Sequence, residues 1–466
     1  MPELQVAPDL NQNEKKKWWI LSVASAGVLL ATIDASIVNI ALPTLSDYFG
    51  ISVRVIAWVT ISYMLIITAF LLVFGRLSDI FGNKPVFVLG MAIFTAGSAL
   101  CALSANVGQL IAFRIFQGFG AAMIMSNTAA IVTSAFPPKQ RGMGLGAIGS
   151  AVSIGLMLGP PLGGLIINYL GWRYIFLVNI PIGIFGVALS IKVLSPRESG
   201  PKMNFPPTDS VLWIFGIIIY VMIFGITGES KIGIAAGSAA GILAVAVILV
   251  FFKRQFKSGN PLFAPELLKN ITFLLSCGAG FFMYMGMVGV SFMLPFFLER
   301  AIGFSPLETG RFLMIIPATT VIMSPLSGAL SDKLGQRPIA SFGTLLATVS
   351  LFFMLSFNQD SDTVRMALNL AAMGIGIGMF GSPNNSALMG SVRDNLRGSA
   401  AGILATVRNL GFVTGAAIVS LLFNMALKKG ITPETADYAA AFVAVLPLPL
   451  AFFAIAFIFS LLRKSV

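Results

Sequence analysis

Long apolar stretches separated by short polar loops run along almost the whole chain. Most are about 20 residues long, which is the length that an α-helix needs to cross the hydrocarbon core of a bilayer. Apolar length and flanking charges predict 14 spanning helices, at about residues 18–42, 56–74, 85–105, 110–130, 143–168, 174–194, 209–228, 232–252, 272–298, 307–328, 338–357, 364–389, 399–425 and 438–462. The pattern therefore predicts an all-α integral membrane protein.

The predicted helices fall into two blocks of six with two extra helices between them. Residues 1–195 are expected to form an N-terminal six-helix bundle, and residues 271–466 a C-terminal one. Residues 196–270 would supply a polar, proline-rich linker, two accessory transmembrane helices and a basic cytoplasmic loop.

The two blocks repeat each other in sequence. A Gly75 to Lys84 loop follows the second helix of the first block, and a similar loop from Gly328 to Arg337 follows the second helix of the last block, 253 residues later. Parallel repeats of this size are typical of secondary transporters, which bind their cargo at the midplane between the halves. Alternating access is the mechanism that this arrangement predicts.

Composition and charge agree with a polytopic membrane protein. The chain of 466 residues is 57% hydrophobic and 10% charged, with a mean hydropathy of +0.91, which excludes an ordinary soluble domain. Of its 30 basic residues, 20 lie in loops on the side of the termini and eight on the opposite side. The positive-inside rule therefore predicts a cell-membrane protein with both termini in the cytoplasm.

The same composition narrows the chemistry. The chain has no histidine, and its two cysteines lie in apolar segments, so neither a metal site nor a disulfide framework is expected. The basic residues form no stripe or block that would suit nucleic acid. No P-loop of the G-x4-G-K-[ST] kind appears, so nothing in the chain indicates ATP-driven export.

One carboxylate, Asp34, falls well inside the first predicted helix, and Arg114 falls inside the fourth. Counted at about 1.5 Å per residue, both lie roughly 10 to 15 Å below the outer surface, so an ion pair between them is possible. Charged groups at this depth usually serve a function. We expect a proton and a cationic substrate to compete for Asp34. The alternatives are a protonated, helix-packing Asp34 and an Arg114 that clamps backbone carbonyls.

The fifth predicted helix has glycines and a proline at the spacing G-x8-G-x3-G-P-x2-G-G, namely Gly146, Gly155, Gly159, Pro160, Gly163 and Gly164. Further motifs lie in the loop from Gly75 to Lys84, the fourth-helix stretch at 110–122 and the first-helix stretch at 31–45. These stretches resemble signatures of the major facilitator superfamily, and more closely of its 14-helix drug:proton antiporter branch, whose antiporter motif has the fifth-helix spacing. The resemblance covers nearly the whole chain and implies the major facilitator fold.

The fifth-helix glycines leave a face without side chains, on which a neighbouring helix can approach closely. Pro160 removes a backbone hydrogen bond and can bend the helix there. A pliable hinge that limits leak and plain close packing are both consistent with these residues.

The loops that follow the second and fourth helices of each half are expected to gate the transporter. Charges at their helix ends could form a latch that holds the outward-open state and breaks on switching. The alternative is a set of solvated loop charges of little energetic weight. The candidates are Gly75, Asp79, Gly82, Lys84, Arg141, Asp332 and Arg397.

A large apolar cavity with one acid is expected between the halves. Its candidate lining residues are Asn39, Trp58, Tyr63, Gln117, Tyr284, Asn384, Asn385 and Arg408. Such a cavity would suit amphipathic organic cations, which are attracted by the carboxylate and by aromatic faces. Arg408 could act like Arg114 in the second half.

These features predict a proton-coupled antiporter that exports hydrophobic or amphipathic compounds, with cations favoured. Its expected partners are small substrates, protons and the bilayer. It would use the proton gradient and no cofactor, and a monomer would suffice. An exporter of a tetracycline-like antibiotic, a siderophore or a lipid is the alternative, followed by a non-transporting sensor. An enzyme is disfavoured, because one carboxylate without a paired acid, metal cluster or activated nucleophile offers little chemistry.

Overall fold

The computed structural model describes residues 10–137, 140–195, 205–226, 231–258, 262, 264–393, 396–427 and 434–463. In this part of the chain every regular element is helical, and 14 helical spans are long and apolar enough to cross a membrane. The predicted fold class is confirmed. Because the number of spans is even, both termini lie at one face of the bundle, here called the terminal face; the opposite face is the distal face.

The first six spans form the N-terminal half. The second span is interrupted at Ala57 and the sixth at Val178, so the six spans contain eight helices. These are α1 (Leu10–Phe49), α2 (Val53–Ile56), α3 (Trp58–Phe81), α4 (Asn83–Ala102), α5 (Val107–Ala135), α6 (Arg141–Tyr169), α7 (Tyr174–Leu177) and α8 (Asn179–Val193). Helix α1 extends beyond the predicted 18–42 at both ends, because a helix can continue past the hydrocarbon core into polar surroundings.

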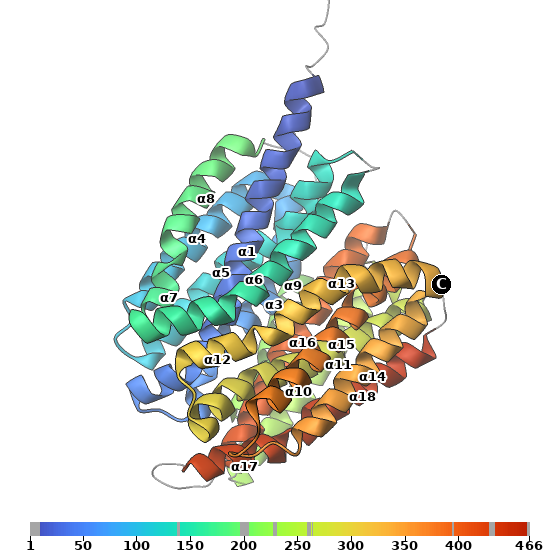
Figure 1. Cartoon of the computed structure of the whole chain (residues 1–466). Coiled ribbons are helices and arrows are strands. Elements are labelled where there is room, and N and C mark those ends of the chain that lie inside the picture. The colour runs from blue at the N-terminus through green and yellow to red at the C-terminus, as the bar shows by residue number, and fades with distance from the viewer. Residues whose placement is uncertain are drawn as a thin grey trace, which may run out of the picture.

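The accessory pair and the C-terminal half follow. The elements are α9 (Pro207–Ile226), α10 (Lys231–Gln255), η2 (Pro265–Lys269), α11 (Ile271–Phe296), η3 (Phe297–Ile302), α12 (Pro306–Leu313), α13 (Ile315–Leu334), α14 (Gln336–Met354), α15 (Thr363–Gly390), α16 (Arg397–Ala426), α17 (Thr435–Val445) and α18 (Pro447–Leu462). Figure 1 shows the blue to green helices of the first half beside the yellow to red helices of the second.

Side-chain caps define several helix starts. Asn106 accepts a hydrogen bond from the backbone N–H of Gln109 at 2.9 Å and so starts α5. Asn270 does the same for α11, and Asp362 for α15. Each cap satisfies an N–H group that has no partner within its own helix.

The internal repeat is visible in the backbone. Gly82, between α3 and α4, has φ of 91°, and Gly335, between α13 and α14, has φ of 89°. Their ψ angles are 151° and 153°. This conformation lies outside the regions open to residues with a Cβ, so glycine is required at both equivalent turns.

The accessory helices lie on one side of the seam between the halves. Helix α9 packs against α3 of the first half and α16 of the second, whereas α10 packs on α9. At the terminal face, Arg254 Nε of α10 donates to Asp209 Oδ1 of α9 at 2.7 Å. Helix α10 presents exposed apolar residues such as Ile242 and Leu249 to its surroundings. Helix α9 therefore covers the seam, and α10 faces the lipid.

The two halves are joined tightly near the distal face. A Cβ at Gly164 of α6 would overlap the backbone of Pro306, and one at Gly310 of α12 would lie 2.6 Å from the Pro160 carbonyl oxygen. Glycine at both positions thus allows the backbones of α6 and α12 to touch.

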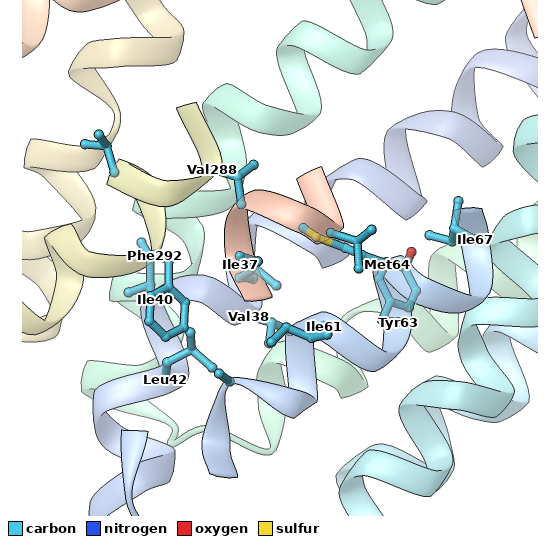
Figure 2. Close-up of a cluster of buried hydrophobic side chains, with 14 of the residues drawn as sticks. Ile37, Val38, Ile40, Leu42, Ile61, Tyr63, Met64, Ile67, Val288 and Phe292 are labelled. Carbon is cyan, nitrogen blue, oxygen red and sulfur yellow. The ribbon is translucent and has the colours of Figure 1, made fainter. Parts of the chain in front are cut away.

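An apolar plug lies beside this crossing. Figure 2 shows Val288 and Phe292 of α11 beside Ile37 and Ile40 of α1. All four side chains are buried in one cluster that includes residues of both halves. Because each half supplies part of the plug, separating the halves at this level would expose apolar surface.

An ion pair at the rim completes the distal closure. Arg300 of η3 pairs with Asp47 of α1, and its Nη2 also donates to the Pro43 carbonyl oxygen at 3.1 Å. The two side chains are 29% and 62% exposed, so the pair is worth at most about 1 kcal/mol. Any opening of the distal face would have to break this pair, so the pair would bias such an equilibrium toward the closed face.

Replacing Arg300 with glutamine should therefore shift this equilibrium toward distal opening by about threefold, since the pair contributes less than about 1 kcal/mol. The measurement is the labelling rate of a Leu42→Cys reporter, buried in the plug, by a maleimide added from the distal face. Cys101 and Cys277 are buried and add little background. Arg311→Gln is the control. Equal rates in the Arg300→Gln and control proteins would contradict a closing role.

Candidate functional site

Asp34 and Arg114 form an ion pair inside the N-terminal half. Oδ2 of Asp34, on α1, accepts a hydrogen bond from Nη1 of Arg114, on α5, at 2.5 Å. Both side chains are 0% exposed. Equal depth in the membrane suggested this contact, and the structure shows it. In this conformation the carboxylate is closed off from solvent.

Two side-chain amides complete the contacts of the carboxylate. Nε2 of Gln117 and Nδ2 of Asn179 each donate to Oδ1 of Asp34 at 2.9 Å. The Gln117 amide has a defined orientation, because its Oε1 accepts from Arg114 Nη1 at 2.6 Å. All these contacts to Asp34 come from donors, so the arrangement suits the charged carboxylate.

Ser98 links the two amides to a fourth helix. Its Oγ, on α4, accepts from Gln117 Nε2 at 2.7 Å and from Asn179 Nδ2 at 3.4 Å. The network therefore joins α1, α4, α5 and α8. Since every one of these side chains is buried, breaking the network would leave polar atoms without partners in a medium that offers none.

Arg114 is held from two further directions. Its Nε donates to the Val59 carbonyl oxygen at 3.1 Å, and its Cζ lies 3.9 Å from the centre of the Tyr63 ring. Nη2 is buried and has no hydrogen-bond partner among the described residues. An unsatisfied buried donor costs about 1–3 kcal/mol. The guanidinium is thus fixed in position but retains bonding capacity for another arrangement.

The antiporter-motif glycines let α6 lie directly on the segment of α1 that carries Asp34. A Cβ at Gly155 would overlap Thr32, and one at Gly159 would overlap Ser36. Ser36 Oγ also donates to the Gly155 carbonyl oxygen at 3.2 Å. Close packing, one of the two interpretations of this motif, is therefore observed along α1.

The other motif positions extend this contact. Gly163 faces Ile37 of α1, and Gly164 and Pro160 reach α12 as described above. Gly146 lies near the start of α6. Helix α6 consequently touches both α1, which carries Asp34, and α12 of the second half.

A Gly159→Ala substitution should weaken this packing, because the added methyl overlaps the Ser36 side chain and lies 3.1 Å from the Ile37 backbone nitrogen. Overpacking of this kind costs about 1–3 kcal/mol. Thermal unfolding of the purified protein should show a lower midpoint. Gly381→Ala is the matched control, since a Cβ at Gly381 meets no described atom within 4 Å. Equal midpoints for the two variants would refute the overlap.

The expected cavity residues divide into separate groups. Tyr63 and Gln117 are buried within the Asp34 network. Trp58 and Asn39 are half-buried nearby, and Asn39 Oδ1 accepts from Thr60 at 3.3 Å. In the second half, Tyr284, Arg408 and Asn385 are half-buried.

For Asn384 the expectation of a cavity contact is wrong in this conformation. The residue is 1% exposed. Its Nδ2 donates to the Ser276 carbonyl oxygen at 3.2 Å, and its Oδ1 accepts from Arg463 Nη1 at 2.9 Å. Both polar atoms of the amide are bound within the C-terminal half, so neither is offered to a cargo.

Arg463 is a structural residue that sequence reasoning counted only as a loop charge. It is 1% exposed, and its Nη2 donates to the Gln336 carbonyl oxygen at 3.1 Å. Burial, and secondly the nearby charge of Arg337, lower the pKa of Arg463 to about 10. It therefore remains protonated near neutral pH and ties the end of α18 to α14 and α15.

An Asn384→Ala variant should lose stability, because Arg463 Nη1 would lose its best acceptor. An unpaired buried donor costs about 1–3 kcal/mol, which should lower the unfolding midpoint measured by intrinsic fluorescence. Asn385→Ala, at the half-buried neighbouring position, is the control and should unfold like the unaltered protein. If the Asn384→Ala protein kept its stability but lost cargo binding, the original prediction that Asn384 lines the cavity would be supported instead.

The gating-loop candidates lie at the terminal face. Asp79 is 3.6 Å from Arg76 one turn earlier and is 43% exposed. Lys84 Nζ donates to the Ile191 carbonyl oxygen near the end of α8 at 2.7 Å. Asp332 is exposed. The side chains of Arg141 and Arg397 lie outside the described part, so the latch stays a prediction.

Sequence reasoning named neither Ser98 nor Asn179 as a site residue. Both are uncharged polar residues in apolar segments, and the polar side chain at such a position was the available signal. The Asp47–Arg300 pair was also missed, because each residue reads as an ordinary charge at a helix end.

Fourteen apolar spans arranged as two related halves, with a buried ion pair in the first, define a multi-pass membrane transporter. The family model described as Major Facilitator Superfamily matches residues 24–416. The chain belongs to that superfamily.

Relatives and a solved structure agree. The chain is 36% identical over 414 residues to the riboflavin transporter RibZ of Clostridioides difficile, covering 89% of this chain and 90% of that protein. It is 30% identical over 411 residues to the putative multidrug resistance protein MdtD of Klebsiella pneumoniae, covering 87% and 86%. A bacterial homologue of the human lysosomal transporter Spinster, solved inward-facing and unoccupied, has a TM-score of 0.66 at 16% identity, covering 96% and 97% of the two chains.

Proposed function

We propose that this transporter is a proton-coupled antiporter that exports hydrophobic or amphipathic compounds across the cytoplasmic membrane, with both termini in the cytoplasm. The observation that carries the proposal is Asp34. Within the described spans it is the one carboxylate placed near mid-membrane, and it is surrounded by donors from three side chains. A carboxylate at this depth can take up a proton from one side of the membrane and release it to the other during the transport cycle.

Protonation of Asp34 would change the balance of charge in the site. The neutral acid no longer attracts Arg114, and its new O–H needs an acceptor. Arg114 has an uncommitted Nη2 and can form other contacts. The proton therefore selects between two arrangements of α1 and α5.

The packing offers a route from this site to the distal closure. Helix α6 lies on α1 through Gly159 and on α12 through Gly164. A shift of α1 would displace α6 and loosen the contact between the halves. In the structure the distal face is closed, so the proposed state is inward-facing, ready to take up cargo from the cytoplasm.

The geometry supports a proton role for Asp34 more than a cation-binding role. The carboxylate is completely buried, and its charge is matched by Arg114. A preference for cationic cargo, expected from the sequence, therefore has no support from an open acid in this conformation. The relatives named above include both a multidrug resistance protein and a riboflavin transporter.

Transport of a flavin-like heterocycle is a second candidate function. It is favoured by the 36% identity to RibZ over most of both chains. Riboflavin and a lipophilic cation should both be used as test cargo.

Asp34→Asn should abolish gradient-driven transport, because the amide cannot take up or release the proton. The measurement is accumulation of riboflavin and of ethidium in inverted vesicles, with and without an imposed acid interior. Asp360→Asn, at an exposed loop position, is the control and should behave like the unaltered protein. Undiminished gradient-driven accumulation in vesicles that contain the Asp34→Asn protein would contradict a role of Asp34 in proton coupling.

A further inference from the structure

Arg408 is a charged residue inside a membrane span that the proposed coupling does not use. It lies on α16, about 16 Å along the helix from Arg397, which places it near the middle of the bilayer. The side chain is half-buried. It forms neither a hydrogen bond nor an ion pair with any residue that the structure describes.

Close packing of α16 on α11 fixes the surroundings of Arg408. A Cβ at Gly411 would lie 2.7 Å from the Phe281 carbonyl oxygen, and one at Gly415 would overlap the Met285 backbone. These glycines bring α16 against α11 at Tyr284, within electrostatic reach of Arg408. Backbone contact therefore places the segment of α16 that carries Arg408 beside Tyr284 of α11.

Two aromatic rings accompany Arg408. Phe412 lies one turn after Arg408 on the same face of α16. Its ring packs edge-to-face on Tyr284, with centroids 5.2 Å apart and an interplanar angle of 81°. Phe412 is thus one helical turn from Arg408, and Tyr284 lies within its electrostatic reach; these three residues are called here the Arg408 cluster.

The two halves differ in their mid-membrane charge. In the first half Arg114 is cancelled by Asp34, and both are sealed from solvent. In the second half the charge of Arg408 has no counter-ion among the described residues and remains partly accessible. A cation approaching this level meets a repulsive charge, whereas an anion or a carbonyl oxygen meets an attractive one.

We propose that the Arg408 cluster is the cargo-recognition site of the second half and binds flat aromatic compounds that carry anionic or carbonyl oxygen. The guanidinium is planar, offers several N–H donors and stacks on aromatic rings, so it suits such a group better than an ammonium does. This inference rests on the proposed transport of amphipathic compounds, but it is independent of proton coupling at Asp34.

Binding of two dyes with the same xanthene ring system tests the cluster. The purified full-length protein is titrated with fluorescein, at a pH where it is fully ionised, and with the cation rhodamine 123, and fluorescence anisotropy is recorded. The unaltered protein should bind fluorescein more tightly. Arg408→Gln should weaken fluorescein binding by about tenfold and leave rhodamine 123 binding equal or stronger.

Two further variants sharpen the result. Arg408→Lys keeps the charge but removes the planar donor array, so it should give an intermediate fluorescein affinity, and it serves if the glutamine variant fails to fold. Arg365→Gln removes an exposed arginine that donates to Ser356, away from the cluster, and should bind both dyes like the unaltered protein.

Several outcomes would overturn the proposal. The proposal fails if the unaltered protein does not bind fluorescein, or if it binds rhodamine 123 more tightly than fluorescein. It also fails if Arg408→Gln binds fluorescein with the same affinity as the unaltered protein. The Asp34→Asn protein separates the two hypotheses. If both the unaltered and the Asp34→Asn protein discriminate between the dyes but neither shows gradient-driven transport, antiport is refuted and the cargo site stands. If the unaltered protein shows coupled transport but does not discriminate between the dyes, the cargo site is refuted and antiport stands.

Discussion

A full ion pair in a low-dielectric interior is the constraint around which the first half is built. Desolvating Asp34 and Arg114 is costly, and removing either partner would leave a buried charge, at a cost of about 3–5 kcal/mol. The pair persists because Gln117, Asn179 and the Val59 carbonyl supply further contacts. Those contacts come from different spans, so the electrostatics of one carboxylate determine how α1, α3, α5 and α8 are oriented.

Glycine packing connects this charged centre to the rest of the molecule. Helix α6 approaches α1 so closely because Gly155 and Gly159 have no side chains, and the same helix crosses α12 at Gly164. A polar network is specific about geometry, and a tightly packed interior transmits displacement instead of absorbing it. In the proposed transport cycle, a change of charge at Asp34 would therefore alter contacts at the interface between the halves.

The two halves share a backbone plan but not a chemistry. Gly82 and Gly335 adopt nearly the same backbone conformation, as expected for an internal repeat. The first half encloses a neutralised ion pair, whereas the second half carries Arg408 beside aromatic rings and uses Arg463 to bind its own helix ends. The proposed coupling site thus lies in the first half and the proposed cargo site in the second. Helix α9 packs against both halves and covers the seam between them on one side.

Four features could be predicted from the sequence: the number of spans, the repeat, the equal depth of Asp34 and Arg114, and the glycine face of α6. Each of these follows from length, spacing or residue type along one helix, because span length is set by the bilayer and side-chain position by the helical repeat. The folded structure was needed to show that Asn179 and Ser98 join the Asp34 site, that Asn384 bonds to Arg463, and that Asp47 pairs with Arg300. These contacts join residues far apart in the chain, and they depend on how each helix is rotated and packed against its neighbours, which hydropathy does not encode.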